Sequence, residues 1–399
     1  MYEYDLTQGI EDGYLAALEI VSRDILINSK KEIEVRTGVD QADLSKAVLT
    51  DARTGKPLSA AEIRQHYEAA SFERKLMLPD RVKALSQDLF NQLLENGATP
   101  EQKTIIFCAS DAHAQTIANE MSNLYSDWCR ENGKEIKNDY AFKCTAASQG
   151  NDFLPEFRGS QTSRFIATTV ELLTTGVDVP NVRNIVFFRY LKSPILLYQM
   201  MGRGTRLDDG KLMFRVYDYT DATRLLGEEF ITALKKTKER EIDDDDNGDD
   251  EPPKVMPQAA NIGFTVQDAG HYVLMNVDGK HVKVSVEKYK RRIAEQLLKE
   301  AATIDKFRAR WIHPQERQDL MNHLVAAGVS PIQVQNVGDM IDYDLYDVLA
   351  EIAYGINPRR RQERVFAFTY KHEEWLESLP KETSATIKAI IAPFADGGT

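Results

Sequence analysis

The stretch Tyr198-Gln-Met-Met-Gly-Arg-Gly-Thr-Arg206 decides the fold of this chain. It closes a short helical pattern that follows an apolar, strand-like run. Arg203 and Arg206 stand three residues apart, so on a helix both guanidinium groups would lie on one face and could point at one anionic target. Gly202 and Gly204 would let the backbone approach a ligand closely. The stretch therefore predicts an anion-binding helix end in an α/β domain.

Written as Q-x-x-G-R-G-x-R, the stretch resembles motif VI of superfamily 2 helicases and translocases. The resemblance implies that Arg203 and Arg206 are catalytic residues that contact the γ-phosphate of ATP. It also implies that Gln199 and Gly202 belong to the nucleotide-binding surface.

A second stretch, residues 164–180, resembles motif V of the same superfamily. It begins as a short apolar strand and continues to Gly176 and Asp178, which are expected to reach the nucleotide through a close backbone approach and a carboxylate to ribose hydroxyls. The superfamily commonly places a phosphate-binding threonine six residues before the glycine, where this chain has Val170. Either Thr168 or Thr169 would then take the DNA-binding role.

Upstream, residues 103–111 resemble motif IV, with an apolar strand followed by small polar residues. Hydroxyls at the start of a helix can bond phosphate, so Ser110 is expected to contact the DNA backbone. Motif IV alone is common in α/β proteins. The three motifs in order over about a hundred residues form a specific pattern.

Apolar strands alternate with helical patterns through this region. We expect strands at Thr104–Cys108, Phe142–Thr145, Phe165–Thr168, Ile185–Phe188 and Met213–Tyr217. The first helix would be capped by Asp111, and the arginine-bearing helix would have Ser193 as N-cap and Pro194 at its first position. Strands separated by helices predict a parallel sheet with helices on both faces, which is a RecA-like α/β fold.

Composition sets the boundaries of the domains. We expect residues 1–20 to end a first RecA-like domain, 21–98 to form a helical linker, and 99–236 to form the second RecA-like domain. Residues 237–258 form an acidic run expected to be a disordered linker. Residues 259–399 are expected to form a mainly α-helical docking domain, with one β-hairpin around Asp278-Gly279.

Net charge and cysteine content exclude few classes of protein. The net charge is −12, and residues 241–251 within the acidic run supply eight negative charges without a Lys or Arg, which leaves −4 for the rest. Overall charge therefore neither supports nor excludes DNA binding. Cys108, Cys129 and Cys144 lack metal-ligand spacing and are expected to be buried thiols in a reducing cytoplasm. No apolar run is long enough for a transmembrane helix, and no secretion signal is visible.

The phosphate-binding half of an ATPase is absent from the sequence. No G-x-x-x-x-G-K-[ST] loop and no Walker B acidic pair occur. Asp80 and the Glu101-Gln-Lys103 run superficially match a nuclease metal site, but a helical pattern separates them, and we interpret the match as coincidence. ATP and Mg²⁺ would be bound mainly by a first motor domain that the chain lacks, and the chain alone is expected to be inactive.

Taken together, the chain resembles the C-terminal half of a type I restriction enzyme R (motor) subunit of the EcoEI-like subgroup. Besides the motifs, Tyr2–Leu15, Asp344–Leu349 and Arg361–Arg364 carry this resemblance. It implies part of an ATP-driven double-stranded DNA translocase and site-specific deoxyribonuclease whose nuclease lies elsewhere. Its implied partners are double-stranded DNA and the methyltransferase and specificity subunits, in the cytoplasm and without a membrane.

Two other classes stay open at this stage. One is a different superfamily 2 enzyme, such as a DNA-repair helicase, which would carry other accessory modules than this C-terminal region. The other is a non-catalytic scaffold built on a degenerate motor domain. The cluster Arg359–Arg361 with Arg364 could be a solvated helix face, a docking surface or a phosphate contact. Asn357 is expected to cap the helix that it opens, with Pro358 at the first helical position.

Overall fold

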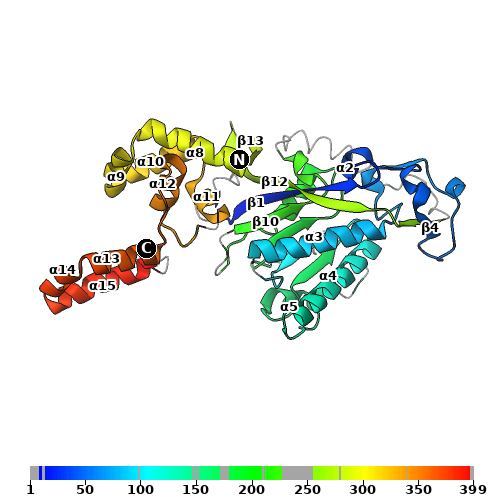
Figure 1. The fold of residues 1–399 in the computed structure, drawn as a ribbon, viewed down its shortest axis with the longest axis horizontal. Coiled ribbons are helices and arrows are strands. Elements are labelled where there is room, and N and C mark those ends of the chain that lie inside the picture. Colours follow the sequence, from blue (N-terminus) through cyan, green and yellow to red (C-terminus); the bar gives the residue numbers. More distant parts are fainter. Residues whose placement is uncertain are drawn as a thin grey trace. The chain divides into compact units, whose positions relative to one another are not determined.

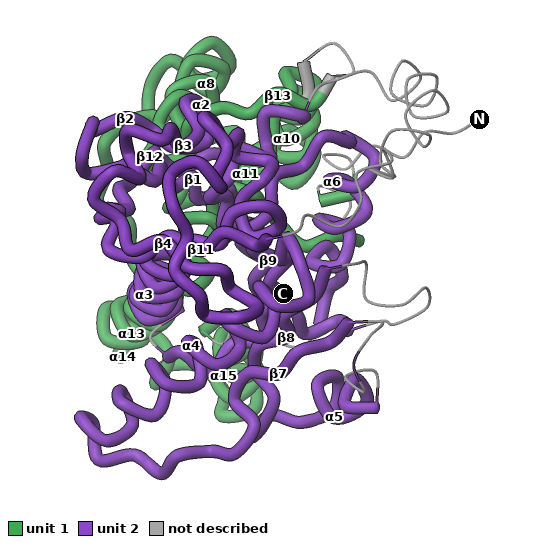
Figure 2. The backbone as a smooth tube through the Cα atoms, turned by 90° about the vertical axis from the view of Figure 1, so that its right-hand side faces the viewer, with its two compact units in different colours: residues 1–18, 273–399 green, residues 19–272 purple. Residues whose placement is uncertain are grey.

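The computed structural model of the chain describes residues 9–10, 14–97, 99–145, 148, 152–170, 179–208, 211, 213–226, 255–277, 280–338 and 340–395. It divides into two compact units, residues 19–272 and residues 1–18 with 273–399, shown in different colours in Figure 2. The motifs all lie in the first of these units. The expected acidic linker falls largely on residues outside the described ranges.

The five expected strands are present and form a parallel sheet. They are β6 (Thr104–Phe107), β7 (Ala141–Lys143), β8 (Ile166–Thr169), β9 (Asn184–Phe187) and β10 (Met213–Asp218). Their order is β10-β9-β6-β8-β7, with every described pair parallel. The middle strands are buried along their whole length, as expected when helices cover both faces. The predicted RecA-like α/β fold is confirmed.

Further strands extend this sheet beyond β10. Strand β1 (Ala17–Ile27) lies next to β10, and β12 (Phe264–Val277) pairs with β1 in antiparallel register from Ile20↔Tyr272 to Ile27↔Phe264. Residues 17–27 are therefore part of the same sheet as the motifs. The sequence placed residues up to 20 in a different domain and began the C-terminal domain at 259. Neither boundary coincides with the division at 18/19 and 272/273.

The prediction of a mostly helical stretch from Ile20 to Ala98 is wrong in its first three quarters. After β1 come short elements, and only α3 (Pro79–Gly97) is a long helix. The short elements are β2 (Glu32–Ile33), α2 (Glu34–Thr37), β3 (Val39–Asp40), η1 (Asp43–Lys46), β4 (Val48–Asp51), η2 (Ala60–Glu62), β5 (His66–Tyr67) and η3 (Ala69–Ser71). Their side chains form a separate small core, closed by β11 (Pro257–Ala260), which pairs with β4. We call residues 32–76 the small subdomain.

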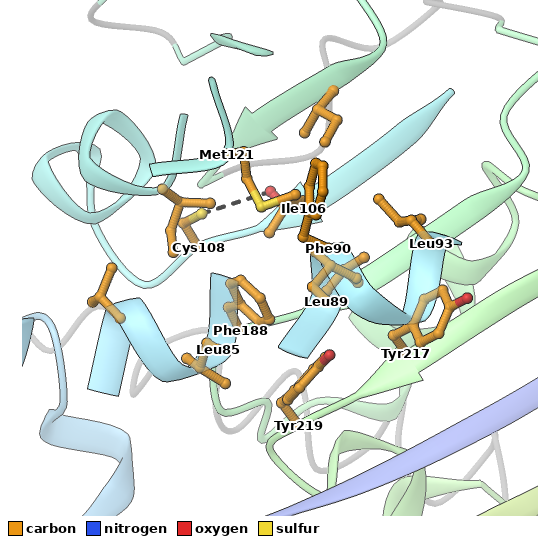
Figure 3. Close-up of a cluster of buried hydrophobic side chains, with 14 of the residues drawn as sticks. Leu85, Leu89, Phe90, Leu93, Ile106, Cys108, Met121, Phe188, Tyr217 and Tyr219 are labelled. Carbon is orange, nitrogen blue, oxygen red and sulfur yellow. Dashed lines mark hydrogen bonds between the residues drawn. The ribbon is translucent and has the colours of Figure 1, made fainter. Parts of the chain in front are cut away.

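Helices α3 and α4 (Asp111–Glu131) pack side by side against the sheet (Figure 1). In Figure 3, Leu85, Leu89 and Leu93 of α3 lie toward side chains from the strand ends, among them Phe188, Tyr217 and Tyr219. These three leucines are fully buried, and burying such a side chain stabilises by about 1.5–3 kcal/mol. This amphipathic helix packs on the RecA-like domain, and all three cysteines are buried free thiols, as expected.

The remaining helices of this unit are short and connect strands. They are α5 (Leu154–Gly159), α6 (Pro194–Met201) and η5 (Ala222–Leu225). Of these, α6 carries the motif VI stretch.

The other unit is mainly helical, as expected. Strand β13 (Lys280–Ser285) pairs with the end of β12, at the predicted hairpin. The helices are α8 (Val286–Glu300), α9 (Ile304–Ile312), α10 (Pro314–Ala326), α11 (Pro331–Val337), α12 (Leu345–Tyr354), α13 (Arg361–Lys371), α14 (Glu373–Ser378) and α15 (Lys381–Ala395). Helix α13 begins three residues later than Pro358, with Arg360 as N-cap, so the expected cap at Asn357 is wrong. The backbone N–H of Arg359 instead donates to the buried Asp347 carboxylate at 3.2 Å.

Candidate functional site

The residues with candidate roles gather at the carboxyl ends of the parallel strands. Motif IV follows β6, motif V follows β8, and the segment leading to motif VI follows β9. Ligands of open α/β sheets bind at this edge, because the strand-to-helix turns present free backbone groups and side chains there. This edge is therefore where the site is expected.

Helix α6 begins as the sequence predicts. The Ser193 hydroxyl accepts a hydrogen bond from the backbone N–H of Leu196, and Pro194 occupies the first turn. Leu197, Met200 and Met201 bury one side of the helix, while Gln199 is exposed. Gln199 is thus available to a ligand, as its expected nucleotide-binding role requires.

The two arginines do not lie on a helical face, which corrects the prediction. Helix α6 ends at Met201 with Gly202 as C-cap, and Arg203 lies in the turn that follows. Arg206 lies beyond this turn in extended chain and is exposed, whereas Arg203 is half-buried. The helical spacing assumed for Arg203 and Arg206 does not continue past Gly202. The chain forms a tight turn there, in which the N–H of Gly204 donates to Met201 O at 2.9 Å.

Gly204 has a packing role. It is buried, and a Cβ at this position would lie 2.3 Å from Cδ2 of Phe214 on β10. Gly202 is exposed, and a Cβ there would lie 3.2 Å from Tyr198 O. The sequence interpreted both glycines as room for a ligand. Only Gly202 keeps that interpretation, because Gly204 makes room for the phenyl ring.

Lys211 was not predicted, and it holds the arginine segment in place. Its side chain is 1% exposed, and its Nζ donates to Pro180 O at 2.8 Å, Gly204 O at 2.8 Å and Arg206 O at 2.7 Å. An ammonium has three N–H donors, so these carbonyls saturate it. Lys211 thereby ties the motif VI backbone to the chain following motif V. In the sequence it follows Asp208-Asp-Gly210, which looks like a solvated turn, and no local signal marks it.

Ser110, rather than Asp111, caps α4. The Ser110 hydroxyl accepts from the N–H of His113 at 3.2 Å and donates to Glu73 O at 2.6 Å. Asp111 lies in the first turn, where its carboxylate pairs with Lys143 at 2.8 Å. Ser110 is half-buried at the edge, so its expected contact with DNA stays a prediction.

Thr168 and Thr169 lie inside the domain in this conformation. Thr168 is 0% exposed, and its hydroxyl donates to Ala114 O of α4 at 2.9 Å. Thr169, the last residue of β8, is 1% exposed. Both side chains are covered because β8 lies in the interior of the sheet under α4. Their expected role as DNA contacts stays a prediction, and neither side chain reaches the surface in this structure. Gly176 and Asp178 lie outside the described residues.

A cavity of about 880 Å³ opens at the same edge, between the small subdomain and the strand ends. Ala109 after β6, Val170 after β8, Phe188–Lys192 after β9 and Thr220 after β10 contribute to its lining. The charged lining is unbalanced toward cations, with Arg64, Arg74, Lys75, Arg81, Arg189 and Lys192 against Glu34 and Glu68. We call this space the basic cavity.

Two contacts attach the small subdomain to motif IV beside this cavity. Arg74 Nε donates to Ala109 O at 2.9 Å, and Glu73 O accepts from Ser110. On the opposite wall, Arg189 donates to Val170 O at 2.6 Å, and its own carbonyl accepts from Thr220 at 2.8 Å. Hydrogen bonds from side chains to backbone carbonyls therefore hold both walls.

A buried ionisable cluster adjoins the basic cavity, and two of its members, Glu34 and Arg81, belong to the lining. Glu34 accepts two hydrogen bonds from Arg81, at 2.8 and 3.1 Å, and both side chains are buried. Burial raises the pKa of the neighbouring Glu73 to about 7, although Arg81 opposes that shift. Burial also lowers the pKa of His113 to about 3, and the Arg81 charge adds to the effect. Sequence spacing gives no sign of this cluster, because its members come from separate elements.

The residues of the superficial nuclease match make separate contacts in the structure. Asp80 accepts from the N–H of Ile262, whereas Lys103 Nζ is directed to Ser163 O and Arg164 O, both at 2.9 Å. Within the described ranges, no group of three or more His, Cys, Asp or Glu side chains could hold a metal ion. No helix in those ranges is long and apolar enough to cross a membrane.

Comparison with known proteins gives matches along the whole chain. The helicase conserved C-terminal domain family matches residues 85–208, and the EcoEI R protein C-terminal family matches residues 287–391. The EcoAI endonuclease subunit of a type I restriction enzyme from Escherichia coli is 26% identical over 449 residues, covering 100% of this chain and 51% of that protein. The EcoKI endonuclease subunit from E. coli K12 is 30% identical over 230 residues, covering 55% of this chain and 18% of that protein.

Among solved structures, a fragment assigned to an HsdR subunit of a type I restriction enzyme from Vibrio vulnificus is 29% identical. The matched region covers 56% of this chain and 36% of the fragment, with a TM-score of 0.39. Fold and family matches together define the class, a helicase-type C-terminal domain followed by an EcoEI R-type C-terminal region. The chain is a relative of the endonuclease subunits of type I restriction enzymes, and it spans about half the length of the EcoAI subunit.

Proposed function

We propose that this chain supplies the second motor domain and a docking domain of the DNA-translocating subunit of a type I restriction-modification system. The similarity to the EcoAI endonuclease subunit over the entire chain carries this proposal. The EcoEI R-type region speaks against a repair helicase, because that alternative called for different accessory modules. Such an enzyme would act on double-stranded DNA in the cytoplasm.

Arg203 and Arg206 fit the phosphate end of ATP. Both follow α6 at the carboxyl edge of the sheet, and the Lys211 ammonium fixes the carbonyl of Arg206 itself. Their guanidinium groups would stabilise the charge that develops on the transferred phosphoryl group. Gln199 and Gly202, both exposed beside them, would contribute to the nucleotide surface, and Gly176 and Asp178 keep their proposed contact with it.

The chain does not offer the rest of an ATP site. Its sequence contains no phosphate loop, and the described residues offer no carboxylate cluster for Mg²⁺. We therefore assign binding of the β-phosphate and Mg²⁺ mainly to a companion motor domain. When bound, Mg²⁺ would neutralise charge on the phosphates, while this chain contributes arginines from the opposite side.

Phosphate release measured on two samples tests this division. The chain alone should not hydrolyse ATP, with or without duplex DNA. The chain joined to a companion domain with a phosphate loop should become a DNA-stimulated ATPase. In that joined protein, Arg203→Lys and Arg206→Lys should each lower turnover strongly, because arginine fingers contribute roughly 10³–10⁵ in rate and lysine lacks the planar fork. Near-normal turnover in both variants would contradict the assigned role.

The helical unit is proposed to dock to the methyltransferase and specificity subunits. Phe366 and Tyr370 of α13 are 74% and 76% exposed, and their rings stack at 6.4 Å. Exposed aromatic side chains in contact are typical of interface cores, where they supply apolar area. The nearby Arg364 is paired to Asp347 within the unit, which favours docking over a phosphate contact.

Co-purification with the methyltransferase subunit tests the docking surface. Phe366→Ser with Tyr370→Ser in the full chain should reduce recovery at least tenfold, since hot-spot aromatics contribute about 2 kcal/mol or more each. Lys371→Ser on the same helix serves as the control for a surface change. Unchanged recovery in the double variant, with the fold intact by circular dichroism, would rule out this surface.

A further inference from the structure

The stretches of motifs IV, V and VI line the basic cavity through Ala109, Val170 and Met200, but none of its six cations belongs to them. Four of its six cations belong to the small subdomain or to α3, and two come from the chain between β9 and α6. Arg203 and Arg206 are not among its lining residues. The cavity is thus a second candidate site in the unit of residues 19–272, apart from the arginines assigned to ATP.

We propose that the basic cavity binds backbone phosphates of the nucleic-acid strand on which the protein acts, with Arg64 and Lys192 as its outer contacts. The proposal rests on the proposed function, because it assigns the DNA of that function to a defined surface. It also replaces Thr168 and Thr169, whose side chains do not reach the surface.

Charge is the first argument. The whole chain carries a net charge of −12, yet the cavity lining has six Lys and Arg side chains against two Glu. The Glu34–Arg81 ion pair neutralises one of each, which leaves five cations against Glu68. A cleft lined by one sign of charge raises the local concentration of the opposite sign, and polyanions gain most from it.

The built interior is the second argument. Arg81 is 2% exposed and lines the cavity, and its Nη1 has no hydrogen-bond partner within the described ranges. The Oε2 atom of Glu34, the other member of the ion pair, also has no hydrogen-bond partner within the described residues. A buried N–H without a partner destabilises the fold, so a phosphate oxygen that reached Arg81 would satisfy a donor that lacks a partner.

The arrangement of the walls is the third argument. Arg64 and Lys192 are both exposed and line the cavity from separate segments, the small subdomain and the chain between β9 and α6, so an anion in the cavity meets cations from both segments. Guanidinium groups of Arg74 and Arg189 donate to the carbonyls of Ala109 and Val170 and hold these walls at the ends of β6 and β8. A preorganised cleft with cations on both walls suits a strand of repeated phosphates, since most protein–DNA contacts go to phosphates and position the strand without reading its sequence.

Fluorescence anisotropy of the full chain with a labelled 30-base-pair duplex tests the proposal. Arg64→Glu with Lys192→Glu should weaken binding at least tenfold. It should also make the log–log dependence of affinity on salt less steep by about 2, because each neutralised phosphate contributes roughly 0.9. Arg64→Gln with Lys192→Gln should give an intermediate loss. The matched control is Lys83→Glu with Arg130→Glu, the same charge change on exposed residues of α3 and α4 outside the cavity.

Equal losses in the cavity and control variants, or no loss in either, would overturn the proposal, as would a wild-type chain that fails to bind the duplex at low salt. A loss confined to labelled ATP, with duplex binding intact, would overturn the nucleic-acid assignment and make the cavity a nucleotide site. Thermal unfolding confirms that the exposed-site variants fold. The proposed function has a separate test, because it would be contradicted by a lack of ATPase activity in the chain joined to a companion motor domain.

Discussion

The Nζ of Lys211 lies 2.7 Å from the carbonyl oxygen of Arg206, and this buried contact fixes the backbone of an exposed arginine. The same ammonium bonds Gly204 O and Pro180 O, so one side chain sets the path of the chain on both sides of the proposed phosphate contact. Lys211 is thus a positioning residue.

Lys211→Met should lower the turnover of the joined ATPase about 10–100-fold, because small misplacements of a catalytic group cost on that order. The KM for ATP should change less than turnover if Arg206 acts in the transition state. In an Arg206→Ala background, Lys211→Met should add little, since its effect passes through the arginine. Full additivity of the two changes would show a purely structural role, and Lys83→Met is the control.

Gly204→Ala should destabilise the chain by about 1–3 kcal/mol, the usual cost of overpacking a core. The added methyl would lie 2.3 Å from the Phe214 ring. Phe214→Leu should recover part of the loss in the double variant by making room. Gly202→Ala is the matched control and should be nearly neutral, because its nearest neighbour is a carbonyl oxygen at 3.2 Å. Chemical denaturation measures all four proteins.

Glu73→Gln should remove a pH-dependent destabilisation. The pKa of Glu73 rises from 4.5 to about 7 in the folded chain, so the folded state holds its proton longer than the unfolded state. Stability from this group is therefore fully present below pH 4.5 and is lost as the pH rises to about 7. The variant should gain on the wild type across that window, by on the order of 3 kcal/mol at pH 8.

The comparison must be made as a difference between the two proteins. The pKa of His113 is lowered to about 3, so its own contribution to stability rises with pH between about 3 and 6.5 and partly cancels that of Glu73. Subtracting the two unfolding profiles removes the His113 contribution. A difference that stays flat from pH 4.5 to 8 would show that Glu73 titrates normally.

Asp347→Asn should destabilise the helical unit by about 1–3 kcal/mol and leave DNA affinity unchanged. Asp347 is buried and accepts from Arg364 at 2.5 and 2.6 Å, and the bond to Asp347 raises the pKa of Arg364. Removing one partner leaves the other charge without its counter-ion, a cost reduced here because Arg364 is partly exposed. Arg359→Ala, at an exposed site, is the control. A loss of duplex binding in Asp347→Asn would instead support a phosphate contact for the cluster of Arg359–Arg361 with Arg364.

The sequence alone determined the parallel sheet and its helices. Buried strands such as Thr104–Phe107 are continuous apolar runs, and helix ends carry local signals such as Ser193 before Pro194. Each of these signals spans only a few residues, so it can be recognised in the sequence without the tertiary structure. The ordered arginine and threonine motifs added the helicase resemblance, which the family matches confirm.

Only the tertiary structure decided which of the candidate side chains can meet a ligand. Thr168 looked accessible in the sequence but is covered by α4, whereas Lys211 looked solvated but is buried under three carbonyl oxygens. Arg64 and Lys192 are 128 positions apart in the chain and line one cavity because the small subdomain folds against the strand ends. Burial and electrostatic surroundings are sums over neighbours from distant segments, and no local pattern encodes them.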